Sequence, residues 1–198
     1  MREILLSTQP KLCVKIASGE KKIEVRKTRP KEQDPFIVLL YCTKTNSEQA
    51  LLLDKNGRLS FGDYRNASSG DYYIADGKVI GEFICDYIDE ITPDYQFGYL
   101  NYLDLDSTCL TIEEINKYGN CKPLYAWHIS NFKLYDKPKI LYDFYKPCPT
   151  KEEYDCRNCE HFEHFEQGIC TNYLTRPPQS WQYVLEKYVK KDSKNEEN

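Results

Sequence analysis

The chain has 198 residues, of which 40% are hydrophobic and 29% are charged. This length provides one domain with a sizeable core and a small appendage at most, which excludes two ordinary domains. The formal net charge of −4 argues against broad, non-specific binding to nucleic acid, because that binding depends on Lys and Arg side chains that neutralise phosphates. No stretch approaches the roughly 18 apolar residues of a membrane span, and the N-terminus lacks the features of a signal peptide, so we expect a cytoplasmic protein without a membrane partner.

Strand and helix patterns alternate in the first third of the chain. Residues 3–7 (EILLS) predict a short strand, and a helix follows, with Pro10 suited to its first position and Gly19 to its C-terminal stop. An alternating strand over 22–28 comes next. The apolar run FIVLLYCT is then typical of a central strand covered on both faces. Residues 50–61 indicate a hairpin with an Asn-Gly turn.

The middle of the chain begins with an irregular loop, expected at 62–77, and continues with a long alternating strand at 78–91, in which Gly81 marks a bend or bulge. Residues 111–114 have the spacing of a capping box and open a short helix that Gly119 closes. Two further strands are expected, at 123–136 and at 180–189. For the second half of the later segment, a helix is the alternative.

These elements predict an α+β fold, because five or six strands are mostly antiparallel and only two or three short helices accompany them. The expected architecture is a small, mixed, mostly antiparallel β-barrel with flanking helices.

Four of the nine cysteines lie within 23 residues near the C-terminus. A Cys-x-x-Cys turn brings two thiolates to one Zn²⁺, and two more cysteines complete a tetrahedral set. We predict a structural zinc, because this polar segment has little apolar material with which to fold otherwise. A loop of reduced thiols is the alternative, and His161 or His164 could replace a cysteine. The predicted metal ligands are Cys148, Cys156, Cys159 and Cys170.

Charge is distributed unevenly along the chain. Residues 21–31 contain six basic side chains and one acid, Glu24, whereas residues 79–116 contain acids and neither Lys nor Arg. The sequence therefore indicates one local basic site on an otherwise acidic protein.

The basic site includes a strand whose apolar residues, Ile23 and Val25, alternate with Lys22, Glu24 and Arg26. Alternation turns the apolar pair to the core and the charged residues to the opposite face, while the preceding lysine lies in a turn. Such a face can clamp a phosphate while the glutamate accepts from a base amino group. It can also be a solvated strand with surface salt bridges.

The segment LLSTQPKLCVKIASGEKKIEVRK resembles the opening of ASCH (ASC-1 homology) domains, which belong to the PUA-like barrel superfamily. Their signature G-x-K-x-x-E-x-R corresponds to Gly19, Lys21, Glu24 and Arg26. The segments GKVIGEFICD, YAWHISNFKLYDKP and RPPQSWQYV resemble later parts of longer family members. This resemblance implies a barrel at 1–146, a cysteine-rich zinc-knuckle insertion at 147–175 and a final barrel strand at 176–189. From their polar, charged composition, residues 190–198 are expected to be a disordered tail.

The resemblance also implies a cleft between the barrel and its flanking helices, where family members bind RNA or nucleotide-like ligands. Some members hydrolyse acetylated cytidine and some act as ribonucleases. In the hydrolase pattern a Thr nucleophile stands where this chain has Glu24, and a carboxylate cannot replace an activated hydroxyl. The candidate nucleotide-binding residues are Ser7, Gln9, Lys21, Lys22, Glu24, Arg26, Trp127 and Ser180.

Three functional hypotheses follow. The leading one is a protein that binds RNA or a modified nucleotide through phosphate neutralisation, base-edge contact and aromatic stacking. The second is a nuclease or nucleoside hydrolase in which Glu24 is a general base and Lys21 stabilises negative charge. The third is an interaction protein that presents its acidic 79–116 region to a basic protein partner.

Overall fold

The computed structural model describes residues 3–45, 48–66, 72–94, 96, 98–99, 104–147 and 172–186. Its helical elements are α1 (Pro10–Ala17), η1 (Tyr64–Asn66), α2 (Leu105–Thr108), α3 (Ile112–Gly119) and η2 (Leu141–Asp143). Its strands are β1 (Glu3–Thr8), β2 (Ile23–Arg26), β3 (Phe36–Cys42), β4 (Gln49–Asp54), β5 (Leu59–Asp63), β6 (Tyr72–Ile74), β7 (Val79–Ile91), β8 (Leu124–Lys139), β9 (Phe144–Tyr145) and β10 (Trp181–Glu186).

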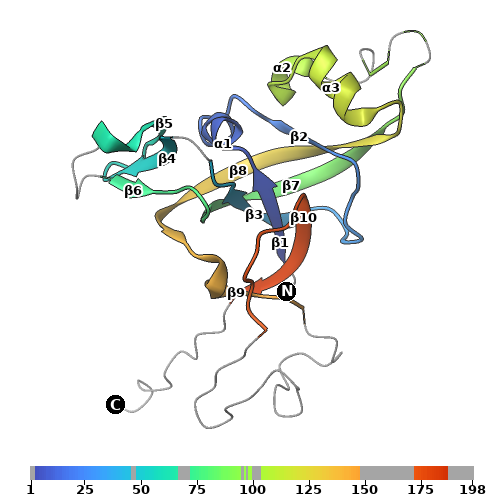
Figure 1. The fold of residues 1–198 in the computed structure, drawn as a ribbon. Coiled ribbons are helices and arrows are strands. Elements are labelled where there is room, and N and C mark those ends of the chain that lie inside the picture. Colours follow the sequence, from blue (N-terminus) through green and yellow to red (C-terminus); the bar gives the residue numbers. More distant parts are fainter. Residues whose placement is uncertain are drawn as a thin grey trace, which may run out of the picture.

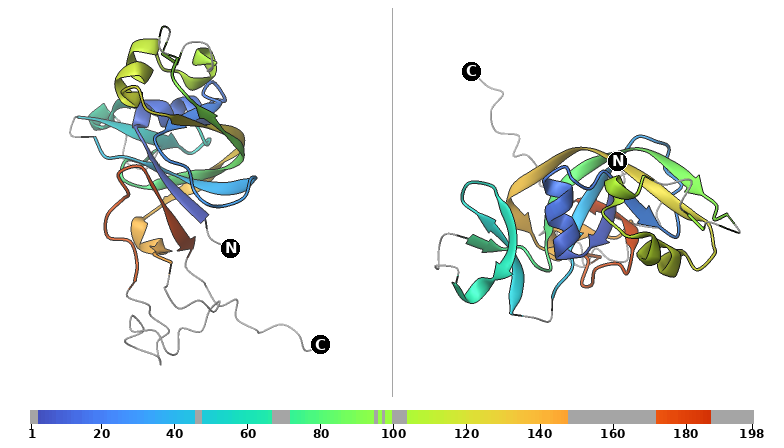
Figure 2. Two further views of the ribbon diagram at one scale, coloured as in Figure 1. Left: turned by 90° about the vertical axis from the view of Figure 1, so that its right-hand side faces the viewer. Right: turned by 90° about the horizontal axis from the view of Figure 1, so that it is seen from above.

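The main sheet has seven strands in the order β2-β8-β7-β3-β1-β10-β9, and a smaller sheet has the order β5-β4-β6. Only β1 and β3 pair in parallel among the described strands. Figures 1 and 2 show the small sheet on one side of the molecule and α2 with α3 on the other. The expected mixed, mostly antiparallel barrel-like fold is confirmed, although backbone pairing does not close the sheet between β2 and β9.

The strands β1 and β3 are buried on both faces, as the apolar run of β3 predicted. Ile4 and Leu6 pack with α1 and Trp127 in one apolar cluster. Leu5, one residue along, packs in a second cluster with Tyr41. Because side chains alternate along a strand, the two clusters lie on opposite faces of the β1–β3 pair.

Local signals for the helices are confirmed, with one difference. Pro10 begins α1, and Gly19 follows its end with φ +75°. Thr111 and Glu114 form both bonds of a capping box at the start of α3. Asn120, rather than Gly119, takes the left-handed conformation that ends α3. Gly119 instead allows close packing, because a Cβ atom there would collide with the Tyr99 hydroxyl.

Some sequence-based boundaries were wrong. The region expected to be an irregular loop at 62–77 contains η1 and β6, whose ladder to β4 forms the edge of the small sheet. Strand β8 continues to Lys139, through Pro138. Trp181–Glu186 is a strand, and the expected tail at 190–198 lies outside the described residues.

The segment 148–171, which is most of the cysteine-rich insertion expected at 147–175, also lies outside the described part of the chain. The residues that flank it lie side by side, because Lys146 N donates to Asn172 O at 3.0 Å and Tyr145 forms a β-bridge with Tyr173. None of the described helices is long and apolar enough to cross a membrane.

Gly81 lies at a shift of register between β7 and β8, as expected of a glycine in a strand. A Cβ atom there would collide with the Lys133 carbonyl oxygen and lie 2.9 Å from Phe132 Cζ. We predict that Gly81→Ala lowers the free energy of unfolding by about 1–3 kcal/mol through overpacking, as measured by urea denaturation. Gly62→Ala in β5 is the control, because a Cβ atom there meets no atom within 4 Å. Equal effects of the two substitutions would contradict the prediction.

Candidate functional site

The basic strand is buried rather than solvated. All four residues of β2 are buried, with Glu24 only 4% and Arg26 only 9% exposed. Ile23 and Val25 pack in the apolar cluster that includes Ile115 of α3, as alternation predicted. The alternative interpretation, a charged surface strand, is therefore wrong.

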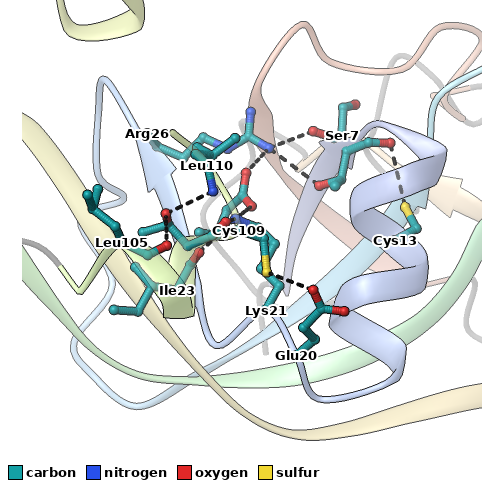
Figure 3. A network of polar contacts seen from close by, with 12 residues as sticks. Ser7, Cys13, Glu20, Lys21, Ile23, Arg26, Leu105, Cys109 and Leu110 are labelled. Atoms are coloured by element: carbon teal, nitrogen blue, oxygen red, sulfur yellow. Dashed lines mark hydrogen bonds and ion pairs between the residues drawn. The ribbon is translucent and has the colours of Figure 1, made fainter. Parts of the chain in front are cut away.

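Three charged side chains form a buried ionic network, which we define as Lys21, Glu24 and Arg26. Figure 3 labels Lys21 and Arg26 within this network. Arg26 Nη2 lies 2.7 Å from Glu24 Oε1, and Lys21 Nζ lies 3.2 Å from Glu24 Oε2. Lys21 Nζ also donates to the carbonyl oxygens of Ile23 at 2.7 Å and Thr108 at 2.6 Å. Lys21 thereby ties β2 to the C-terminal end of α2.

Arg26 extends the network to β1. Its Nη2 donates to the Ser7 carbonyl oxygen at 2.7 Å and lies 3.4 Å from Thr8 Oγ1. Ser7 in turn donates from its backbone N to Ser180 O at 2.9 Å and from Oγ to Pro178 O at 2.7 Å. A chain of polar contacts therefore runs from β2 through β1 to the segment that leads into β10.

Aromatic rings lie along the same contact of β2 with β1 and β10, which we call the closure. Trp127 pairs opposite Glu24 in the β2–β8 ladder, is fully buried, and has its ring centroid 5.9 Å from that of Trp181. Trp181 Nε1 donates to Thr28 Oγ1 at 3.0 Å, and the Tyr183 hydroxyl accepts from Lys31 N at 2.7 Å. The loop after β2 thus rests on β10.

The structure brings together most of the residues selected from the sequence. Ser7, Lys21, Glu24, Arg26, Trp127 and Ser180 all belong to this closure. Gln9 and Lys22 are exposed, and the backbone N of Lys22, not its side chain, bonds to Ser107 O. Sequence reasoning missed Thr28 and Thr108. Thr108 takes part through its carbonyl oxygen, which no residue pattern indicates.

The four cysteines predicted to hold zinc lie outside the described residues. Within the described ranges, no group of three or more His, Cys, Asp or Glu side chains gathers at a spacing suited to a metal ion. The zinc ligand set stays a prediction from spacing.

Glu24 is held as an anion. Burial by itself raises the pKa of its carboxyl group, but the positive charges of Arg26 and Lys21 outweigh burial, and the pKa lies below its usual value.

Two donors in this part of the fold, Arg26 Nε and Trp127 Nε1, are buried and have no acceptor among the described residues. A buried donor without an acceptor carries an unfavourable desolvation free energy of about 1–3 kcal/mol.

We predict that Glu24→Gln lowers the free energy of unfolding at neutral pH by about 3–5 kcal/mol, because it leaves two buried cations without an anion. Urea denaturation measures this change. Glu20→Gln is the matched control, since Glu20 forms an exposed ion pair with Lys15 at 3.0 Å and its loss should cost less than about 1 kcal/mol.

The difference in stability between the wild type and Glu24→Gln should depend on pH. The pKa of Glu24 is lowered in the folded protein relative to about 4.5, so Glu24 contributes stability above that pH. This contribution is lost as the pH falls through the lowered folded value. The wild type and Glu24→Gln should therefore converge in stability in acid. A difference that stays constant down to about pH 3 would rule out an ionised Glu24 as its source.

Comparison with known proteins supports the fold. No family model matches the chain, and no curated protein matches it. Among solved structures, the ASCH protein of Zymomonas mobilis is similar with a TM-score of 0.51 and 14% identity, over 91% of this chain and 86% of that chain. Two single-substitution variants of the same protein are similar with TM-scores of 0.50, at 13% and 14% identity, over 91% of this chain and 88% and 87% of theirs. At this identity the similarity shows the fold, and the chain accordingly has the fold of an ASCH protein.

Proposed function

We propose that this protein binds a short RNA or a modified nucleotide where β2 meets β1 and β10. The observation that carries the proposal is the pair of buried donors without acceptors, Arg26 Nε and Trp127 Nε1. They belong to neighbouring strands, at ladder positions two residues apart. A ligand phosphate or base-edge oxygen would satisfy them, and the ASCH-type fold is compatible with a nucleic-acid ligand.

In this proposal Lys21 and Glu24 position Arg26 and do not themselves contact the ligand. Glu24 and Ser7 O both engage Arg26 Nη2, which orients the guanidinium plane, while Lys21 Nζ lies 3.2 Å from the second oxygen of Glu24 and adds a positive charge beside it. A guanidinium that is already oriented loses less conformational entropy when it binds an anion.

Exposed basic residues next to β2 provide the phosphate-attracting surface. Lys22, Lys27, Arg29 and Lys31 are exposed. Lys27 lies over the Tyr118 ring at 4.8 Å, and Arg29 lies 3.9 Å from Asp34. Because the whole chain carries a net charge of −4, this local surface suits a short or flipped-out ligand better than a long duplex.

The enzyme hypothesis has less support from the geometry. A general base needs a pKa near the working pH and a free oxygen. The pKa of Glu24 is lowered, which argues against a general base. Oε1 pairs with Arg26, whereas Oε2 lies 3.2 Å from Lys21 Nζ but accepts no hydrogen bond from the described residues. Binding without turnover is therefore the proposed activity.

The acidic-surface hypothesis concerns the region 79–116, part of which is the set of exposed carboxylates on β7. Asp86 accepts from Ser130 Oγ at 2.7 Å, and Asp89 lies 2.9 Å from His128 Nε2, whose ring stacks on Tyr87. These acids already have partners on β8, so they offer less to a basic protein than the sequence pattern indicated.

Fluorescence anisotropy with a labelled RNA of about 8 nucleotides tests the proposal. Trp127→Phe keeps a ring but removes the Nε1 donor, and we expect it to weaken binding by about five- to tenfold. Arg26→Lys should weaken binding similarly, because lysine cannot present a donor at the Nε position. Lys31→Ala should reduce the salt dependence by about one phosphate contact.

Lys117→Ala, on the exposed side of α3, is the control for charge, and thermal unfolding checks that each variant is folded. The proposal fails if the wild type binds no RNA or mononucleotide at about 50 mM salt. It also fails if folded Trp127→Phe and Arg26→Lys bind as the wild type does.

A structural zinc ion held by Cys148, Cys156, Cys159 and Cys170 is a second part of the proposal, and it rests on their spacing. Metal analysis of the purified protein should give ~1 equivalent of zinc, and Cys156→Ser should lower this amount. Cys121→Ser is the control, because Cys121 is an exposed free thiol. A wild-type content below about 0.2 equivalents would defeat the zinc assignment.

A further inference from the structure

A pocket of about 630 Å³ lies on the other face of the β1–β3 pair from the ionic network. Its floor includes Tyr41, which belongs to the same apolar cluster as Leu5, whereas Trp127 and Leu6 belong to the cluster on the opposite face. Three other segments complete its walls: 76–78 before β7, 140–142 around η2, and 175–177 before β10. The volume is in the range of small-molecule sites.

Two lysines, Lys44 and Lys78, line this pocket. Neither Lys44 nor Lys78 forms an ion pair with any described residue. Lys44 is held in place by Gly77, since a Cβ atom at that glycine would lie 2.6 Å from Lys44 Cε. The aliphatic part of Lys44 therefore packs closely against the backbone at Gly77.

Asp76 also lines the pocket, but its carboxylate is engaged elsewhere. One oxygen accepts from Leu51 N at 2.7 Å, and the other accepts from Thr45 N at 3.1 Å and Thr45 Oγ1 at 2.8 Å. Asp76 thus fixes the loop that carries Lys44 and is only a partial counter-charge to the two lysines.

The Tyr41 hydroxyl offers a donor to the pocket. The residue is 2% exposed, and no described residue accepts a hydrogen bond from its hydroxyl group. Burial, followed by the nearby Cys42 and Asp76, raises the pKa of Tyr41, which keeps the hydroxyl protonated at neutral pH. Thr43 and Thr175 add hydroxyl groups to the same walls.

The rim is apolar and unusually exposed. Ile140 is 48% and Tyr142 is 53% exposed, and both line the pocket with Leu141 and Pro177. Large apolar side chains exposed at a mostly apolar pocket that holds a few polar groups are typical of ligand sites. A ligand body that packs on them would remove this apolar surface from water.

We propose that this pocket binds a small phosphomonoester with an aromatic or similarly flat apolar body. A phosphomonoester carries a charge of about −1.5 to −2 at neutral pH and has three acceptor oxygens. Two lysines and the Tyr41 hydroxyl match that charge and that number of acceptors better than they match a carboxylate. The apolar rim takes the body of the ligand.

Isothermal titration at low salt with phenyl phosphate as the probe tests this site. We expect phenyl phosphate to bind at least about tenfold more tightly than inorganic phosphate, which lacks the apolar body, or benzoate, which lacks the second negative charge. The double variant Lys44→Ala/Lys78→Ala should weaken phenyl phosphate binding by about tenfold or more, and Tyr41→Phe by about threefold.

The double variant Lys117→Ala/Lys122→Ala matches the change in charge and should bind as the wild type does. Trp127→Phe should also bind phenyl phosphate normally, so that failure here is distinguishable from failure of the proposed RNA site. The site assignment is overturned if the wild type shows no binding, if inorganic phosphate binds as tightly as phenyl phosphate, or if Lys44→Ala/Lys78→Ala has no larger effect than the control.

Discussion

The buried contact between Arg26 and β1 closes a sheet that its backbone leaves open. The ladder ends at β2 on one side and at β9 on the other. Arg26 Nη2 bridges from Glu24 to Ser7 O, and Trp181 and Tyr183 bind the loop that follows β2. Side chains thus do what strand pairing does in a closed barrel. The positions of α2, the loop after β2 and the start of β10 all depend on this closure.

Joining two strands through buried charged residues carries a large desolvation penalty. Removing a carboxylate and two cations from water costs several kcal/mol per ion, and mutual attraction repays this only with good geometry. An apolar contact could close the sheet with a smaller desolvation penalty, but it would not hold the guanidinium group of Arg26 in one orientation. The donor that Arg26 leaves unused, Nε, is therefore the feature that apolar packing could not supply, and in the proposed function it is the group that a ligand oxygen would satisfy.

The sequence predicted what depends on neighbours along the chain. The capping box of α3 and the alternation of Ile23 and Val25 follow from spacing alone, and both are present. Alternation assigned Glu24 and Arg26 to one face but could not show that this face is covered. The covering groups are backbone carbonyls of Ser7 and Thr108, 19 and 87 residues away from their partners. The pocket at Tyr41 escaped sequence analysis for the same reason, because four distant segments form it.

The two proposed sites share the β1–β3 pair yet should act independently. Ser7 pairs with Tyr41, and Thr8 pairs with Cys42, in a parallel ladder whose residues alternate between the two faces. Coupling between sites requires an element with two arrangements that both ligands bias. A fully buried, doubly packed strand pair is a poor candidate for such an element, since a shift would disturb both apolar clusters at once. The tight packing of β1 and β3 therefore favours independent binding at the two proposed sites.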